Sequence, residues 1–238
     1  MVLVQLKNCN KEYIMKLSNE TLTVLKNFAG INSGIEFKTG NKIATISSTK
    51  TVLAKATLPD EFPQDFCIYD LNQFLSVFSL NKDTELDFDS QHVIFKAGRS
   101  KTKYRTTVKT MIVSPPDKEL KLPTVDGEFQ LKDEDLAQAL KNAAVLGSSH
   151  ISFESDGSKV VVSTFDAKDD SAHTNTIEIG EINNGKVFKA VFLAENFKMI
   201  PGSYSVEVSS QGLASFKNEK GDLQYWIAIE AKESKFGE

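Results

Sequence analysis

The spacing of apolar residues in the first half of the chain switches between a helical and a strand period. Residues 17–30, LSNETLTVLKNFAG, carry apolar side chains three or four positions apart. This pattern predicts a helix whose expected N-cap is Ser18. Residues 70–80, DLNQFLSVFSL, repeat that helical pattern. Alternating segments predict strands at residues 34–48, 51–58 and 65–70, and again at 84–90, 92–98 and 102–113. Turn residues at 39–41 and in LPDEFP, residues 58–63, separate the earlier strands.

The same order of patterns returns from residue 128 onward. Residues 131–147 predict a helix capped by Asp133, and residues 193–202, LAENFKMIPG, predict a short helix that ends at Pro201 and Gly202. Strands are expected at residues 150–155, 159–165, 175–182 and 186–192, and then at 203–210, 213–218 and 223–231. The order helix, strands, helix, strands therefore occurs twice.

Matching positions recur at a nearly constant offset, which indicates internal duplication. LKNFAG at residues 25–30 returns as LKNAAV at 140–145, and Phe74 and Phe88 match Phe197 and Val208. Residues 114–127, SPPDKELKLPTVDG, hold three of the six prolines and predict an exposed connector. We therefore expect an N-terminal extension or misplaced start at 1–14, a first domain at 15–113, the connector at 114–127 and a second domain at 128–238.

The faces of these helices opposite their apolar residues are polar and carry lysine. A solvated face is the ordinary explanation for such a pattern. The alternative is a surface for phosphates, where lysine supplies charge and amides and hydroxyls supply hydrogen bonds that ignore sequence. The residues concerned are Asn19, Thr23, Lys26 and Asn27 in the first helix, Asn72, Gln73 and Ser76 in the second, Gln138, Lys141 and Asn142 in the third, and Lys198 in the fourth.

Composition narrows the class of protein. The chain is 40% hydrophobic and 25% charged, which is ordinary for a globular protein, and its formal net charge of −4 argues mildly against bulk attraction to nucleic acid. Two cysteines, Cys9 and Cys67, make no disulfide framework, and no apolar segment is long enough for a signal peptide or a membrane span. We expect an intracellular protein without a membrane anchor.

Four stretches of the chain are distinctive: MKLSNETLTVLKNFAGINSGI from Met15, IYDLNQFLSVFSL from Ile68, MIPGSY from Met199 and YWIAIEA from Tyr225. In this order they resemble one family, the DNA polymerase sliding clamps of T-even-type tailed bacteriophages. The resemblance implies an α+β DNA clamp fold with two similar domains, each with two helices packed on antiparallel sheets. It also implies that three copies join head to tail into a ring with helices around the hole.

Function, partners and location follow from the same resemblance. A clamp encircles duplex DNA without sequence preference and tethers the replicative DNA polymerase, after an ATP-dependent clamp loader opens the homotrimer. The place of work would be the cytoplasm of the infected bacterial host, and a role in late viral transcription is also implied. No cofactor is expected.

The candidate DNA-binding residues come from these matches and from one basic run. Lys16 and Lys26 lie in the first matched stretch, Lys141 holds the matching place in the repeat, and Lys198 rests on its position in the short fourth helix. GRSKTKYR adds Arg99, Lys101 and Lys103 as either a solvated strand edge or a contact with DNA or a partner. For a polymerase or loader peptide, the resemblance implies an apolar pocket near the connector, bordered by Leu120, Leu122 and Pro123.

Two other classes of protein stay open at this point. A duplicated, β-rich structural or virion protein would share the repeat without needing lysines around a common hole. A metal-dependent nuclease could use the acidic cluster in FDAKDDSAHTN, which contains Asp166, Asp169, Asp170 and His173. A solvated loop explains that cluster better, and no nucleotide-binding or hydrolase motif is present, so we expect no enzyme activity.

Overall fold

The computed structural model describes residues 14–116, 118, 120–169, 171–182 and 186–237. The expected extension at 1–14 thus lies almost wholly outside the described residues. The helices are α1 (Asn19–Ile31), α2 (Leu71–Ser79) and α3 (Asp133–Leu146), with 3-10 turns at Lys109–Met111 and Ala194–Asn196. No helix in the described ranges is long and apolar enough to cross a membrane.

The strands form antiparallel sheets, as the α+β prediction requires. An eight-stranded sheet has the order β4-β1-β2-β3-β15-β14-β13-β8, a five-stranded sheet β11-β10-β9-β12-β16, and a three-stranded sheet β5-β6-β7. The first-half strands are β1 (Ile35–Phe37), β2 (Gly40–Ile46), β3 (Val52–Phe62), β4 (Phe66–Ile68), β5 (Glu85–Phe88), β6 (His92–Ala97) and β7 (Ser100–Arg105). The others are β8 (Gly127–Leu131), β9 (His150–Asp156), β10 (Lys159–Phe165), β11 (Asn175–Glu181), β12 (Val187–Leu193), β13 (Tyr204–Ser209), β14 (Leu213–Asn218), β15 (Leu223–Ala228) and β16 (Lys235–Phe236).

The strands of the two halves follow the same order, so the repeat seen in the sequence is also a repeat of structure. The run β4-β1-β2-β3 matches β12-β9-β10-β11, and β5-β6-β7 matches β13-β14-β15. Met15 bridges Leu86 of β5, just as β8 pairs with β13. Consequently β3 corresponds to β11, and β15 corresponds to β7.

Helix α1 forms where its sequence predicts it. The Ser18 hydroxyl accepts from the N–H of Thr21 at 3.2 Å, and Ser18 in turn donates to the carboxylate of Asp60. Leu25 and Phe28 are fully buried on the face that packs against β3. The cap and the apolar face together fix both the start and the orientation of the helix.

The second half departs from the prediction at its helices. Helix α3 begins at Asp133 rather than being capped by it, and the Asp133 N–H donates to the hydroxyl of Ser203 at 3.2 Å. The expected fourth helix is only the 3-10 turn Ala194–Asn196. Few residues remain between β12 and Pro201, and a single turn is too short to be stable as an α-helix. The prediction of two helices in each domain is therefore wrong for the second half.

Two strand predictions also need correction, and one strand of the structure was not predicted. Strand β3 continues through LPDEFP to Phe62, so the turn follows it rather than interrupting it. The strand predicted at 102–113 ends at Arg105 and gives way to a 3-10 turn at Lys109–Met111. Strand β8 was missed, because its five residues, GEFQL, adjoin the connector.

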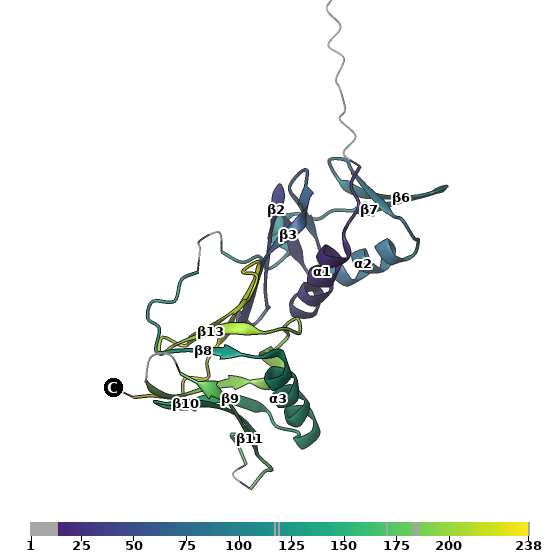
Figure 1. Ribbon diagram of the computed structural model, residues 1–238. Helices are drawn as coiled ribbons and strands as arrows, with labels where there is room; N and C mark the ends of the chain where they lie inside the picture. The colour runs from purple at the N-terminus through teal and green to yellow at the C-terminus, as the bar shows by residue number, and fades with distance from the viewer. Residues whose placement is uncertain (1–13, 117, 119, 170, 183–185, 238) are drawn as a thin grey trace, which may run out of the picture.

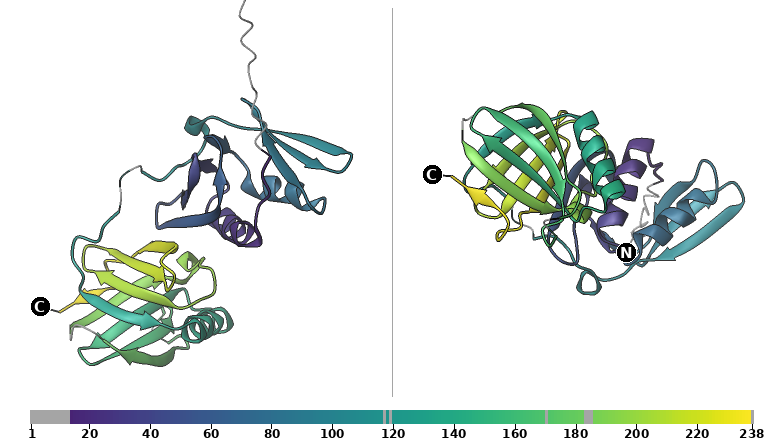
Figure 2. Two further views of the ribbon diagram at one scale, coloured as in Figure 1. Left: turned by 45° about the horizontal axis from the view of Figure 1, so that its top comes forward. Right: turned by 90° about the horizontal axis from the view of Figure 1, so that it is seen from below.

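Strand β3 of the first half pairs with β15 of the second, and so one sheet runs through both halves. The register joins Ala56 to Leu223, Ala54 to Tyr225 and Val52 to Ile227. One large apolar core underlies the helices of both halves. Figures 1 and 2 show α1 and α3 next to each other on one side of the molecule, while the connector runs along the other side.

Candidate nucleic-acid interface and connector groove

The helical side of the molecule presents three of the predicted lysines to solvent. Lys26 is exposed on α1, Lys141 is exposed on α3, and Lys198 is exposed just after the 3-10 turn. Lys16 precedes α1 and lies 3.6 Å from Glu85 of β5, so it belongs to the edge of the first half. Lys82, which the sequence did not single out, lines the same hollow between α1 and α2 as Lys26.

The two asparagines of the repeated LKN motif bond to other elements of the chain, which neither the solvated-face nor the phosphate-surface interpretation predicted. The Asn27 amide donates to the carbonyl of Lys198 at 3.1 Å, and its oxygen accepts from the Tyr225 hydroxyl at 2.8 Å. The Asn142 amide donates to the side-chain oxygen of Asn175 at 2.7 Å, on strand β11. Each asparagine therefore ties its helix to another element, and lysine alone carries the charge beside it.

Lys101 and Lys103 of the basic run lie on the edge strand β7, and Arg99 lies in the turn before it. The side chain of Tyr104 packs edge-on against Phe74 of α2, and its hydroxyl donates to Gln73. Because side chains alternate along a strand, Lys101 and Lys103 point to the opposite face of this sheet. The structure thus does not bring Arg99, Lys101 and Lys103 together with Lys26 and Lys141.

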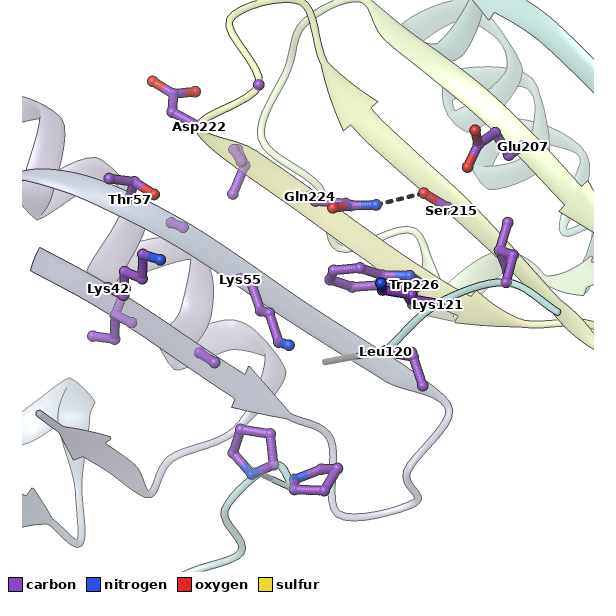
Figure 3. Close-up of a pocket in the computed structure, with 18 of the residues that line it drawn as sticks. Lys42, Lys55, Thr57, Leu120, Lys121, Glu207, Ser215, Asp222, Gln224 and Trp226 are labelled. Carbon is purple, nitrogen blue, oxygen red and sulfur yellow. Dashed lines mark hydrogen bonds between the residues drawn. The ribbon is translucent and has the colours of Figure 1, made fainter. Parts of the chain in front are cut away.

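A groove of about 680 Å³ lies under the connector, on the sheet face opposite α1. Figure 3 shows Lys55 of β3 and Trp226 of β15 side by side on its floor, with Leu120 of the connector next to them. The indole is only 5% exposed and packs with Leu53, and the Lys55 ammonium lies 5.5 Å from the ring centroid. Leu122 also lines the groove, whereas the exposed Pro123 is not among its lining residues.

The end of the connector is anchored to the second half by Asp126. Its carboxylate accepts from the N–H of Ser210 at 2.8 Å and from the Lys186 ammonium at 3.1 Å. The Ser210 N–H above all, with Lys186, lowers the pKa of Asp126 to about 2. This carboxylate is therefore ionised at neutral pH and holds the connector beside the groove.

The described carboxylates of the acidic loop are bound by neighbouring groups of the chain. Asp166 accepts from the Lys168 N–H and the Ser149 hydroxyl, and Asp169 accepts from Ser171, contacts that lower the pKa of both carboxyls. Asp170 lies outside the described residues, and His173 is exposed. Within the described ranges, no group of His, Cys, Asp and Glu side chains is close enough to hold a metal ion.

Comparison with known proteins places both halves in one family. Residues 16–113 match the family described as DNA polymerase processivity factor, and residues 128–231 match the family described as gp45 sliding clamp, C terminal. The sliding clamp of Vibrio phage KVP40 is 36% identical over 91% of this chain and 100% of its own length. The sliding clamp of Enterobacteria phage T4 is 34% identical over 91% of this chain and 97% of its own.

Solved structures agree on the fold. The proliferating cellular nuclear antigen of Entamoeba histolytica has a TM-score of 0.64 at 16% identity, over 92% of this chain and 98% of its own. That of A. fulgidus, solved with the C-terminal region of FEN-1 bound, has a TM-score of 0.67 at 16% identity, over 92% and 98% of the two chains. The chain belongs to the sliding clamp family and is a DNA polymerase processivity factor, not an enzyme.

Proposed function

We propose that three copies of this chain close head to tail into a ring that encircles duplex DNA. One observation carries the proposal: within the chain β15 pairs with β3, while their repeat counterparts β7 and β11 are both edge strands in the described part of the chain. If β7 of one copy pairs with β11 of the next, every junction in the ring has the same form. The number three rests on the sequence resemblance.

The two edges have complementary faces. On β7, Thr102 and Tyr104 lie on the helical side and Lys101 and Lys103 on the outer side. On β11, Ile177 and Ile179 face the core, while Thr176 and Glu178 are exposed. An antiparallel pairing like that of β3 and β15 would bring apolar side chains together inside and lysine beside glutamate outside. It would also cover two exposed edges that otherwise invite aggregation.

The helical side then faces the hole, and Lys26, Lys141 and Lys198 are the residues we assign to DNA. A ring retains DNA by topology, so a few exposed lysines among amides and hydroxyls suffice and leave the protein free to slide. A net charge of −4 suits the rest of the surface, because it discourages contact of DNA with the outside. We assign Arg99, Lys101 and Lys103 to the junction between copies, the partner-contact reading left open above.

The groove under the connector is the proposed site for peptide tails of the replicative polymerase and the clamp loader. Its indole floor and its Leu120 and Leu122 border offer apolar contacts, and Lys42 and Lys55 favour a peptide that carries carboxylates. Tethering raises the local concentration of polymerase at the primer. Loading by an ATP-dependent loader, action in the host cytoplasm and a role in late transcription complete the proposal and rest on the resemblance.

Sedimentation over a range of protein concentrations tests the ring. We expect a species of three chains that dissociates on dilution. Loaded with its loader and ATP, the protein should stay on nicked circular DNA and slide off after the circle is cut. A monomer at every concentration, or equal retention on cut DNA, would contradict the ring.

The lining is tested by replacing Lys26 and Lys141 together by alanine. Both side chains are exposed, so we expect the fold and the assembly to be unchanged and loading or sliding at moderate salt to be impaired. Lys217→Ala with Lys232→Ala, two exposed lysines outside the helices, is the matched control. Unchanged processivity in the Lys26 and Lys141 variant would argue against the assignment.

A further inference from the structure

A set of side-chain hydrogen bonds joins α1 to the second half at one buried hydroxyl. The Tyr225 hydroxyl donates to Asn27 at 2.8 Å and accepts from the N–H of Ile200 at 3.1 Å. The Asn27 amide also donates to the carbonyl of Lys198 at 3.1 Å. One amide and one hydroxyl therefore connect α1, β15 and residues 196–200, which we call the junction segment.

The surroundings make these bonds costly to lose. Tyr225 and Tyr204 are buried, with ring centroids 6.1 Å apart and rings edge to face. The Tyr204 hydroxyl donates to the carbonyl of Ile200, so both backbone groups of Ile200 are bound to tyrosines. A buried polar group that loses its partner costs more free energy than an exposed one, because water cannot replace the partner.

The other end of the junction segment is also tied to the first half. Thr51 is the residue just before β3, and its hydroxyl donates to the side-chain oxygen of Asn196 at 3.1 Å. Asn196 is only 7% exposed. The junction segment is thus fixed to the first half at two separate points.

We infer that Asn27 and Tyr225 are positioning residues that set the angle between the two halves, and that ring closure depends on this angle. Strand pairing alone leaves the angle loose, because the twist between neighbouring strands ranges over about 25° in proteins. In a ring of three copies, any deviation in this angle occurs in each copy, so three deviations add up before the last two edges can pair. The dependence on ring closure rests on the proposed function, whereas the setting of the angle does not.

The matching asparagine supplies an internal comparison. In the described part of the chain Asn142 bonds to Asn175 of its own half, although Asn142 and Asn27 stand in the same LKN sequence. The motif therefore places an asparagine in the second half of each helix, and the neighbouring element determines the hydrogen-bond partner of that asparagine. Among the described contacts, the asparagine of the first repeat is the one that bonds across the two halves.

The angle can be measured without a ring. In a Cys9→Ser background, Lys82→Cys and Lys168→Cys place one spin label on an exposed site in each half, and Cys67 is buried. Labelled chain diluted into unlabelled chain then reports the distance between halves of one chain. We expect a narrow distribution in this parent and a broad one in Tyr225→Phe and in Asn27→Ala.

The substitutions are chosen to leave each half folded. Tyr225→Phe retains the buried ring, and Asn27 is only partly buried. Thr23→Ala removes a hydrogen bond within α1 alone and is the control, which should keep the narrow distribution. Asn27→Asp can still accept from Tyr225 but cannot donate to Lys198, so we expect partial rescue relative to Asn27→Ala.

Ring closure is measured on the same variants by sedimentation. We expect about tenfold weaker assembly in Tyr225→Phe and in Asn27→Ala. The double variant should lose less than the product of the two effects, because the two substitutions share one contact although each also removes a bond of its own. An unchanged distance distribution would overturn the inference. A broadened distribution with unchanged assembly would overturn its second part. If the parent forms no ring, the ring proposal fails while the distances still decide the inference.

Discussion

The junction inside the chain and the two free edges use the same kind of strand but are sealed differently. At β3–β15, Trp226 covers the outer face, and Tyr225 with its bond to Asn27 covers the inner face. At β7 and β11 the corresponding outer positions carry Lys101, Lys103 and Glu178. Burial of aromatic side chains contributes strongly to the stability of a junction, whereas charged pairs in water contribute little. The comparison indicates that a closed ring would part between copies and not between halves.

Trp226→Ala should have the largest effect, because it breaks the junction inside the chain. Removing a buried aromatic side chain costs about 3–5 kcal/mol of unfolding free energy. Urea unfolding followed by circular dichroism measures the loss. Val187→Ala, at an exposed apolar residue, is the control and should be near neutral. A loss below about 1 kcal/mol in Trp226→Ala would mean that the indole does not seal this junction.

Lys103→Pro should break the other junction and leave the first intact. The two-residue turn between β6 and β7 sets the register, so the Lys103 N–H points away from β6, and proline there costs no bond within the sheet. A strand of the neighbouring copy would lose a hydrogen bond and collide with the pyrrolidine ring of the proline. This costs about 1–3 kcal/mol, which is up to roughly a hundredfold in assembly. Sedimentation of Lys103→Pro beside Lys103→Thr checks this, and equal assembly of the two would exclude β7 as the contact.

Raising the salt concentration should weaken the junction between copies less than Lys103→Pro does, and it should leave the junction within the chain unchanged. The range of electrostatic interaction falls from about 10 Å at 0.1 M to about 3 Å at 1 M ionic strength. We expect assembly to weaken several-fold over this interval in sodium chloride, while the distance between the halves stays constant. Assembly that strengthens with salt would show that apolar contacts dominate the β7–β11 pairing.

Lowering the pH should have the smallest effect, and this effect should arise at Asp126, which anchors the connector to the second half. The pKa of Asp126 is lowered to about 2 from 3.8, so its contribution is complete above the higher value and is lost as the pH falls toward the lower one. Asp126→Asn should therefore be less stable than the parent by about 1 kcal/mol at pH 7. The difference between the two proteins should shrink at pH 2. A constant difference would place the effect elsewhere.

The repeat could be predicted from sequence because apolar spacing reports burial directly. The faces of α1 and α2 and the order of strands follow from it, and the comparisons confirm the family and the clamp fold. The extra helix after Leu193 was predicted from the same spacing and is wrong, because Phe197 is buried from an irregular segment. Apolar periodicity does not distinguish a short helix from a buried loop.

The roles of polar residues were harder to predict. The position of Asn27 on the polar face of α1 indicated solvent exposure, whereas its partners Tyr225 and Lys198 lie far along the chain. The basic run was recognisable as an edge, but its face could be assigned only once Tyr104 was seen against α2. The DNA and peptide assignments stay predictions until the experiments above are done.

Trp226 is the single tryptophan of the chain, and it lies between the connector groove and the inner junction. Its ultraviolet emission therefore needs no label to report on either place. A peptide that displaces Leu120 or the Lys55 ammonium should alter the intensity, whereas separation of β3 from β15 should expose the indole to water and shift the emission to longer wavelength. The emission of Trp226 can therefore report directly on the site where we propose that a polymerase tail docks.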